Sequence, residues 1–162
     1  MNEISNLDLA YVAGLADGEG WFTLIKRKQK TKGKLYINYF PQFGICNNNR
    51  EVLEWVKVTV GLGGVYKKSR KGNRKQGWQY ISSCLGAVEF TNLLFPFLKI
   101  KRLQAEILIK FQQTRGIREP FWQGSNPKEV TDLRMMYVNQ IRQLNLRGRD
   151  PLELPFIGEV IN

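Results

Sequence analysis

The sequence contains no histidine, and this absence removes several kinds of active site. Catalytic triads built on imidazole, nucleases that depend on histidine and zinc sites that need an imidazole ligand are all excluded. No glycine-rich loop is followed by Lys and then Ser or Thr, so a Walker-type nucleotide site is not expected either. We therefore expect neither imidazole chemistry nor a nucleotide cofactor.

Cysteine and long apolar runs are also scarce. The two cysteines, Cys46 and Cys84, are too few for a disulfide framework, lack the spacing of a zinc finger, and are expected to be buried thiols. No apolar run approaches ~20 residues and no signal peptide is visible, so we expect an intracellular chain with no membrane partner. The length of 162 residues suffices for a sizeable core, and we expect one domain over residues 1–162.

Positive charge is what the sequence has in excess. Lysine and arginine number 25 against 14 acidic residues, which gives a formal net charge of +11. This excess favours a polyanionic partner, with nucleic acid first, an anionic membrane surface second, and a basic solvated surface without a partner as the remaining alternative. Two acid-free segments, residues 20–50 and 55–88, hold 14 of the 25 basic residues. The charge is therefore concentrated in two parts of the chain.

Hydrophobic periodicity divides the chain into alternating helices and hairpins. Period-two segments with turn residues between them predict strands over residues 21–30, 35–46, 65–70 and 77–83. Helical spacing predicts helices over residues 7–20, 50–60, 85–98 with an interruption at Pro96, 101–116 and 128–146. Pro41 lacks an N–H group and is expected at a sheet edge or a bulge. The order is helix, two strands, helix, two strands and then further helices, which is an α+β fold.

Alternation within the strands assigns one face to the core and the other to a partner. The predicted core-facing residues are Phe22, Leu24, Ile37, Phe43, Ile45, Val65, Trp78 and Tyr80. The opposite face mixes basic, amide and aromatic side chains, and this mixture suits double-stranded DNA, because Lys and Arg neutralise phosphates while Gln, Asn and Arg match base edges. The predicted DNA-binding residues are Thr23, Ile25, Arg27, Gln29, Asn38, Gln42, Tyr66, Lys68, Arg70, Gln79 and Ile81.

The first helix ends in two acids and carries small residues along one side. Asp17 and Glu19 stand where the helix macrodipole is already negative, at a cost of roughly 0.3 to 1 kcal/mol each when exposed. A bound divalent cation such as Mg²⁺ would offset this cost, because hard ions are held by carboxylates, carbonyls, water and phosphates.

The small residues Ala10, Gly14 and Gly18 fall on one stripe, and with Ala13 and Asp17 beside them they would let a second helix approach closely. If that helix belongs to a second copy of the chain, the acids of both copies converge. The alternative is a small-residue helix that packs inside one subunit and ends at a glycine cap.

The segment VAGLADGEG, residues 12–20, resembles the LAGLIDADG motif of homing endonucleases, with Glu19 at the position of the principal acidic metal ligand. The segment PFLKIKRLQA, residues 96–105, is similar to a family segment that carries an active-site lysine, here Lys101. Asn47 matches a position where members often have Gln. The resemblance covers roughly residues 7–115 and implies the LAGLIDADG αββαββα fold, with an antiparallel DNA-binding saddle and extra C-terminal helices.

The resemblance also implies an activity. The motif occurs once, and single-motif members act as homodimers, so the implied protein is an intron-encoded, sequence-specific endonuclease that cuts both strands of DNA. Glu19 from each subunit, helped by the Gly18 carbonyl, would bind Mg²⁺ at the scissile phosphate, Lys101 would add positive charge, and Asn47 would orient water, while Asp17 would support the helix junction. A strand of about ten residues spans ~33 Å, so two copies would cover ~20 base pairs of a pseudo-palindromic site.

Three alternatives to this enzyme remain. An intron RNA maturase or a non-cleaving DNA-binding protein of the same fold would keep the basic hairpins, and an interaction protein would use the small-residue helix only to dimerise.

Overall fold

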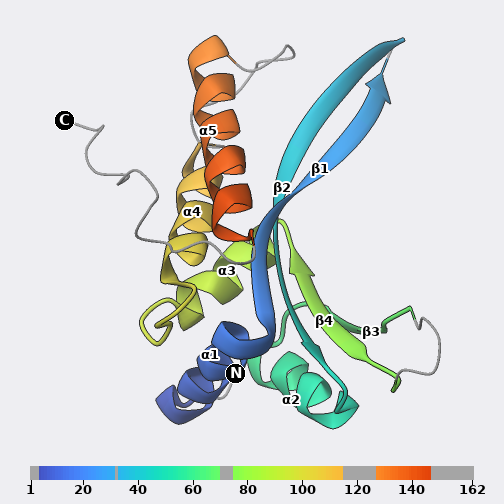
Figure 1. Cartoon of the computed structure of the whole chain (residues 1–162), viewed down its shortest axis with the longest axis vertical. Coiled ribbons are helices and arrows are strands. Elements are labelled where there is room, and N and C mark those ends of the chain that lie inside the picture. The colour runs from blue at the N-terminus through green and yellow to red at the C-terminus, as the bar shows by residue number, and fades with distance from the viewer. Residues whose placement is uncertain (1–3, 32, 70–74, 115–126, 147–162) are drawn as a thin grey trace.

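The computed structural model places a four-stranded antiparallel sheet against a layer of helices (Figure 1). It describes residues 4–31, 33–69, 75–114 and 127–146. The elements are α1 (Asn6–Glu19), β1 (Gly20–Thr31), β2 (Lys34–Asn47), α2 (Arg50–Val60), β3 (Gly64–Lys67), β4 (Trp78–Ser83), α3 (Leu85–Leu94), α4 (Arg102–Gln113) and α5 (Lys128–Leu144). This order confirms the predicted α+β fold with an αββαββα core followed by further helices.

The sheet has the strand order β1-β2-β4-β3, and every neighbouring pair is antiparallel. Directly opposite residues share a face, so Phe22 with Phe43, and Ile45 with Tyr80, all point toward the helices. The helices lie on this side of the sheet, while the far end of the hairpin of β1 and β2 bends away from them (Figure 1). The other face is concave and no described element covers it.

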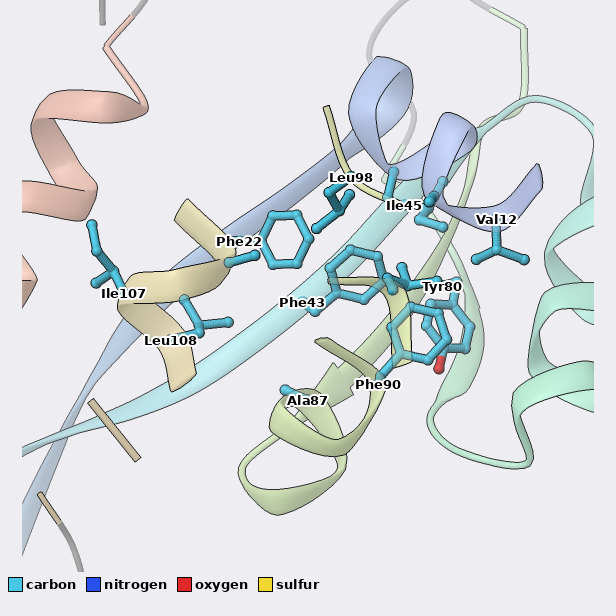
Figure 2. Close-up of a cluster of buried hydrophobic side chains, with 14 of the residues drawn as sticks. Val12, Phe22, Phe43, Ile45, Tyr80, Ala87, Phe90, Leu98, Ile107 and Leu108 are labelled. Carbon is cyan, nitrogen blue, oxygen red and sulfur yellow. The ribbon is translucent and has the colours of Figure 1, made fainter. Parts of the chain in front are cut away.

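An aromatic cluster fills the space between the sheet and the helices (Figure 2). The ring centroid of Phe43 lies 4.8 Å from that of Phe22 and 4.6 Å from that of Phe90, and all three side chains are fully buried. The buried hydroxyl of Tyr80 donates a hydrogen bond to the Leu62 carbonyl at 2.7 Å, so this polar group keeps a partner inside the core. The cluster fixes which face of each strand is turned inward.

Local signals set the ends of the helices. Ser5 Oγ accepts a hydrogen bond from the Asp8 N–H at 3.1 Å and caps α1. Asn49 caps α2 in the same way, and Gly61 ends that helix in the left-handed conformation at φ 70°. None of the described helices is long and apolar enough to cross a membrane.

Pro41 lies in the central strand β2, at the residue where β2 loses its second neighbour. The Cys84 N–H donates to the Pro41 carbonyl at 2.8 Å, and β4 has already ended at Ser83. The nitrogen and the carbonyl of a strand residue point to the same side. The nitrogen of Pro41, which carries no hydrogen, therefore faces the side on which β4 has already ended, and no hydrogen bond between strands is lost. From here back to its start, β2 pairs with β1 alone.

Two predictions of burial are wrong. Ile37 was expected in the core, but its side chain is 48% exposed, because the hairpin of β1 and β2 extends past the helices. Cys46 and Cys84 were expected to be buried thiols, yet both are partly exposed. Cys46 alternates with Ile45 and therefore lies on the open face, where its sulfur accepts a hydrogen bond from Lys68 Nζ at 3.4 Å.

Candidate active site and nucleic-acid interface

The chain passes from α1 into β1 without a loop, and this junction presents Glu19. A Cβ at Gly20 would lie 2.6 Å from the Ala16 carbonyl oxygen, so only glycine fits the close approach of strand to helix. Glu19 is the last residue of α1 and is exposed, as is Gly18. The last turn contains no basic residue, and none of the ion pairs among the described residues involves Glu19. Its carboxylate therefore lies at the negative end of the helix without a direct ion pair.

Asp17 is only two residues away but has a different environment. Its side chain is 9% exposed and accepts three backbone hydrogen bonds, from the N–H groups of Lys99 at 2.8 Å, Ile100 at 3.2 Å and Lys101 at 2.9 Å. These groups precede α4 and would lack partners without the carboxylate. Asp17 therefore joins the end of α1 to the start of α4.

Lys101 completes this junction in the reverse direction. Its Nζ donates hydrogen bonds to the carbonyl oxygens of Ala16 at 3.0 Å and Asp17 at 2.6 Å, and so places a cation at the C-terminal end of α1. Burial lowers the pKa of Lys101, and the negative charges of Asp17 and Glu19 raise it part of the way back. The ammonium group thus lies at the same helix end as the exposed carboxylate of Glu19.

Asn47 lies at the same end of the sheet, since Ile45, two residues earlier in β2, pairs with Gly20. Its Oδ1 accepts a hydrogen bond from the Asn49 N–H at 2.8 Å, which shapes the turn into α2. Asn47 makes no hydrogen bond with Glu19 or Lys101. Lys101 thus forms hydrogen bonds with the motif itself, whereas Asn47 only lies at the same end of the sheet.

The open face of the sheet collects most of the residues predicted to bind DNA. The register pairs Thr23 with Gln42 and Arg27 with Asn38 across β1 and β2, and it pairs Tyr66 with Gln79 across β3 and β4. The predicted residues found on this face are Thr23, Ile25, Arg27, Asn38, Gln42, Tyr66, Lys68, Gln79 and Ile81. The side chain of Gln29 and the whole of Arg70 lie outside the described part of the chain.

The open face also contains four residues that the sequence analysis missed. Trp21 lies across Gly44, where an added Cβ would come within 2.2 Å of the indole ring. Phe40 lies beneath Arg27, whose guanidinium carbon is 5.0 Å from the ring centroid. Cys46 and Ser83 complete the set, and Ser83 accepts a hydrogen bond from Gln42 at 3.3 Å. The same two-residue alternation would have found all four.

The outer side of α1 carries the small residues. Ala10, Gly14 and Gly18 are exposed, and a Cβ at Gly14 or Gly18 would meet no atom within 4 Å. Ala13 and Asp17 were also predicted for a face shared with a second copy, but the helix turns both toward the interior, with Ala13 fully buried. The exposed stripe is therefore narrower than predicted.

Large side chains border this stripe. Leu7 is 84% and Tyr11 is 55% exposed, and a groove lies beside them between α1 and α2. Trp55 forms part of the groove, with its ring 5.5 Å from that of Tyr11 in an edge-on arrangement. The outer side of α1 thus presents an apolar surface with small residues at its centre.

The donor set suits a hard divalent cation only when other oxygen ligands join it. Among the described residues, no group of three or more His, Cys, Asp or Glu side chains lies together. Glu19 offers one free carboxylate and Gly18 one carbonyl near it in the chain, while the carboxylate of Asp17 already accepts three hydrogen bonds. Mg²⁺ is typically held by one or two carboxylates together with water and substrate phosphates, and this site fits that description.

Comparison with known proteins places the fold and this site in one family. The sequence pattern of the LAGLIDADG endonucleases matches residues 12–117. The chain therefore belongs to the LAGLIDADG endonuclease family, and the matched segment contains Glu19, Asn47 and Lys101. No curated protein sequence matches the chain.

Solved structures of homing endonucleases share the fold. The archaeal intron-encoded enzyme I-Vdi141I in complex with DNA is 19% identical, with a TM-score of 0.67 over 90% of this chain and 89% of that chain. I-CvuI in complex with its target is 16% identical, with a TM-score of 0.66 over 89% and 86%. I-SmaMI bound to uncleaveable DNA is 17% identical, with a TM-score of 0.60 over 91% of this chain but 47% of that chain.

Proposed function

We propose that this protein is a homodimeric, sequence-specific endonuclease that acts inside the cell on a long, pseudo-palindromic site in double-stranded DNA and hydrolyses phosphodiester bonds with a divalent cation. The observation that carries the proposal is the end of α1, where an exposed Glu19 carboxylate and the Lys101 ammonium group lie together beside an open sheet face. Family membership and the DNA-bound neighbours I-CvuI and I-Vdi141I support the same function.

The open face has the size and composition for a DNA groove. β1 has 12 residues, which at roughly 3.4 Å each corresponds to ~40 Å, a little more than one turn of B-DNA. Arg27, Asn38 and Gln79 can contact base edges, while Lys68 can neutralise a phosphate. Two copies related by a two-fold axis would then cover ~20 base pairs with partial palindromic symmetry.

The homodimer is supported by the motif count and by the surface of α1. The motif occurs once in this chain. The chain spans most of I-CvuI and I-Vdi141I but about half of I-SmaMI, as expected if the longer protein holds two such units. Gly14 and Gly18 leave open space that a second α1 could fill, and Leu7 and Tyr11 would be covered with them. A two-fold axis through this stripe would bring the two Glu19 residues together.

Each residue at the junction has a chemical task in this proposal. Glu19 and the Gly18 carbonyl would hold the cation, and Mg²⁺ is the expected ion; the structures of I-CvuI with DNA were solved in the presence of Ca or Mg. When bound, the cation would stabilise the charge developing on the phosphate and lower the pKa of the attacking water. Lys101 adds a fixed positive charge near the phosphate, and Asn47 can orient water with its amide group. Asp17 holds Lys101 and the start of α4 in place.

Substitution of Glu19 by Gln tests the enzyme. A library of random DNA duplexes is incubated with the protein and Mg²⁺, the cut ends are sequenced, and the recovered duplex is then used as substrate. We expect Glu19→Gln to abolish cleavage while the affinity for that duplex stays within about tenfold, because the carboxylate holds the ion and the sheet holds the DNA. Glu89→Gln, the same change on an exposed acid of α3, should leave cleavage unchanged.

Cleavage that persists in the Glu19→Gln variant would remove the proposed ligand. A natural-sequence chain that binds a duplex specifically but leaves it intact with Mg²⁺ would instead be a DNA-binding protein of the same fold.

A further inference from the structure

The basic residues of β1 lie on both faces of the sheet. Arg27 is on the open face, but alternation turns Lys26, Lys28 and Lys30 to the side that carries the helices. We refer to these three residues as the lysine row. The proposed base contacts of the open face give the lysine row no role, although it holds half of the six basic residues from Gly20 to Lys34.

The helices do not cover the lysine row. Nearer the centre of the sheet, Phe22 is fully buried and Leu24 is 5% exposed, whereas all three lysines are exposed. The cross-strand neighbours of Lys28 and Lys30 are also uncovered, since Ile37 opposite Lys28 is 48% exposed and Leu35 opposite Lys30 is 61% exposed. In Figure 1 this end of the hairpin bends away from α4 and α5. The helix layer reaches Tyr39, which lies opposite Lys26 and whose ring centroid is 5.9 Å from the guanidinium carbon of Arg142 in α5, and it ends before Lys28 and Lys30.

No acidic group of the described chain neutralises these lysines. None of the ion pairs among the described residues includes them, and the sequence has no acid between Gly20 and Arg50. Three like charges on alternate residues of one strand repel one another, which is unfavourable unless anions lie close by. The row therefore fits an anionic partner better than an apolar or a cationic one.

The hairpin is narrow enough here for its lysines to reach both sides of a groove. β1 is an edge strand, and β2 has no second neighbour between its start and Pro41, so this part is a two-stranded ribbon. Its strands are ~5 Å apart, and the major groove is ~12 Å wide and ~8.5 Å deep and admits such a ribbon. With the side chains of the open face on the base edges, the ribbon backbone lies near the level of the flanking phosphates. Lysine stems can then extend over the ribbon edge toward those phosphates.

We propose that the lysine row binds the phosphates that flank the groove occupied by the hairpin, so that the hairpin contacts one duplex with both of its faces. The inference rests on the proposed function and adds to it a division of roles between the two faces of β1. Arg27 and its open-face neighbours read sequence, and the lysine row supplies affinity that does not depend on sequence. Ile37 and Leu35 support the stems of Lys28 and Lys30 from the neighbouring strand.

The dependence of affinity on salt tests this division. The probes are a random-sequence duplex of about 30 base pairs and the duplex recovered from the cleavage selection. We expect the triple variant Lys26→Gln, Lys28→Gln, Lys30→Gln to lower the slope of log affinity against log salt by about 0.9 for each phosphate that is no longer neutralised, and by a similar amount on both duplexes. The ratio of specific to non-specific affinity should stay within about threefold, whereas Arg27→Ala should change that ratio.

Two matched variants serve as controls. Lys57→Gln, Lys110→Gln, Lys128→Gln removes the same charge from exposed or half-exposed positions in the helix layer and should leave the slope unchanged. Replacement of the lysine row by three arginines should keep both slope and affinity. All substitutions are at side chains exposed to solvent or nearly so, and circular dichroism should show native folding.

The outcomes separate this inference from the proposed function. A slope that falls equally in both lysine-to-glutamine triples, or in neither, would overturn the lysine row as a phosphate contact while leaving the enzyme in place. Loss of affinity for the selected duplex alone would assign the row to base reading and would also overturn the inference. A natural-sequence chain that binds neither duplex would remove the proposed function and the inference together.

Discussion

At the scale of single residues, two acids of the same motif have opposite environments. Asp17 is buried among three backbone N–H groups, whereas Glu19 is exposed with no cation of the described chain paired to it. The sequence predicted functional roles for both acids, and its resemblance to the family predicted one for Lys101. It contained no sign that the partners of Asp17 would come from residues 99–101, because hydrogen bonds between segments more than 80 residues apart leave no periodic pattern in the chain.

The pKa of Lys101 leads to a prediction about pH. Burial lowers this pKa, so the folded protein releases the proton at a lower pH than the unfolded chain. The charge of Lys101 therefore costs folding free energy below the folded pKa, and this cost disappears as the pH rises from the folded to the unfolded pKa. If the ammonium group assists cleavage, activity should decline on the alkaline side at a pH below 10.5, the ordinary lysine value. Lys101→Arg should move that decline upward, because the guanidinium stays charged.

Single-turnover cleavage rates between about pH 7 and pH 10, with duplex binding measured in parallel, check the prediction. An identical alkaline decline in the natural-sequence protein and in Lys101→Arg would separate Lys101 from the reaction.

At the scale of elements, α1 serves two surfaces at once. Its inner side contributes Leu9, Val12 and Ala13 to the core, and its outer side exposes Gly14 and Gly18 to open space. The sequence predicted the exposed stripe of Ala10, Gly14 and Gly18, but it also assigned Ala13 and Asp17, which the helix buries, to the shared face. The error has a physical cause, since small side chains suit a tight contact inside a chain as well as one between chains, and their spacing alone does not distinguish the two.

Gly14→Leu should therefore weaken the dimer without harming the fold of the single chain. A Cβ at Gly14 meets no atom within 4 Å, and leucine is a better helix former than glycine, which is roughly 0.8 to 1 kcal/mol less favourable than alanine, so the free energy of unfolding of the monomer should not fall. The larger side chain would hold two α1 helices apart, and we expect the dimer dissociation constant to rise at least about tenfold.

Sedimentation equilibrium and chemical denaturation measure the two effects. Thr131→Leu, which adds leucine to an exposed position of α5, should change neither. A dimer of undiminished affinity in Gly14→Leu would place the subunit contact elsewhere on the molecule.

At the scale of the whole molecule, the sheet separates a helix layer from an open concave face. Alternation in the strands and the order of the elements were enough to predict this arrangement, because the core face of each strand is set by large apolar residues such as Phe22, Phe43 and Tyr80. How far the helices extend over the sheet was not predictable. Alternation along β2 correctly assigns Ile37 to the core face, but this residue lies beyond the helix layer. Alternation tells which face a side chain is on and contains no information on how far the helices extend.

The assembled molecule should be a two-fold dimer on a long site. Light scattering of the free protein at micromolar concentration should give twice the mass of one chain, because the apolar stripe of α1 would otherwise face water. Footprinting on the selected duplex should protect about 20 base pairs with two-fold symmetry. A monomer at that concentration, or protection of only a few base pairs, would contradict the shared-helix arrangement.

The junction between Asp17 and Lys101 has a consequence for incomplete chains. A polypeptide that stops before Lys99 contains the whole acidic motif, both hairpins and Glu19, but it lacks every backbone donor for the Asp17 carboxylate and the cation that closes the end of α1. Such a truncated chain would contain the family motif, but the end of α1 that presents Glu19 would lack the contacts that hold it in place. Under the proposed function, a copy of the chain that ends before residue 99 should therefore leave DNA uncut.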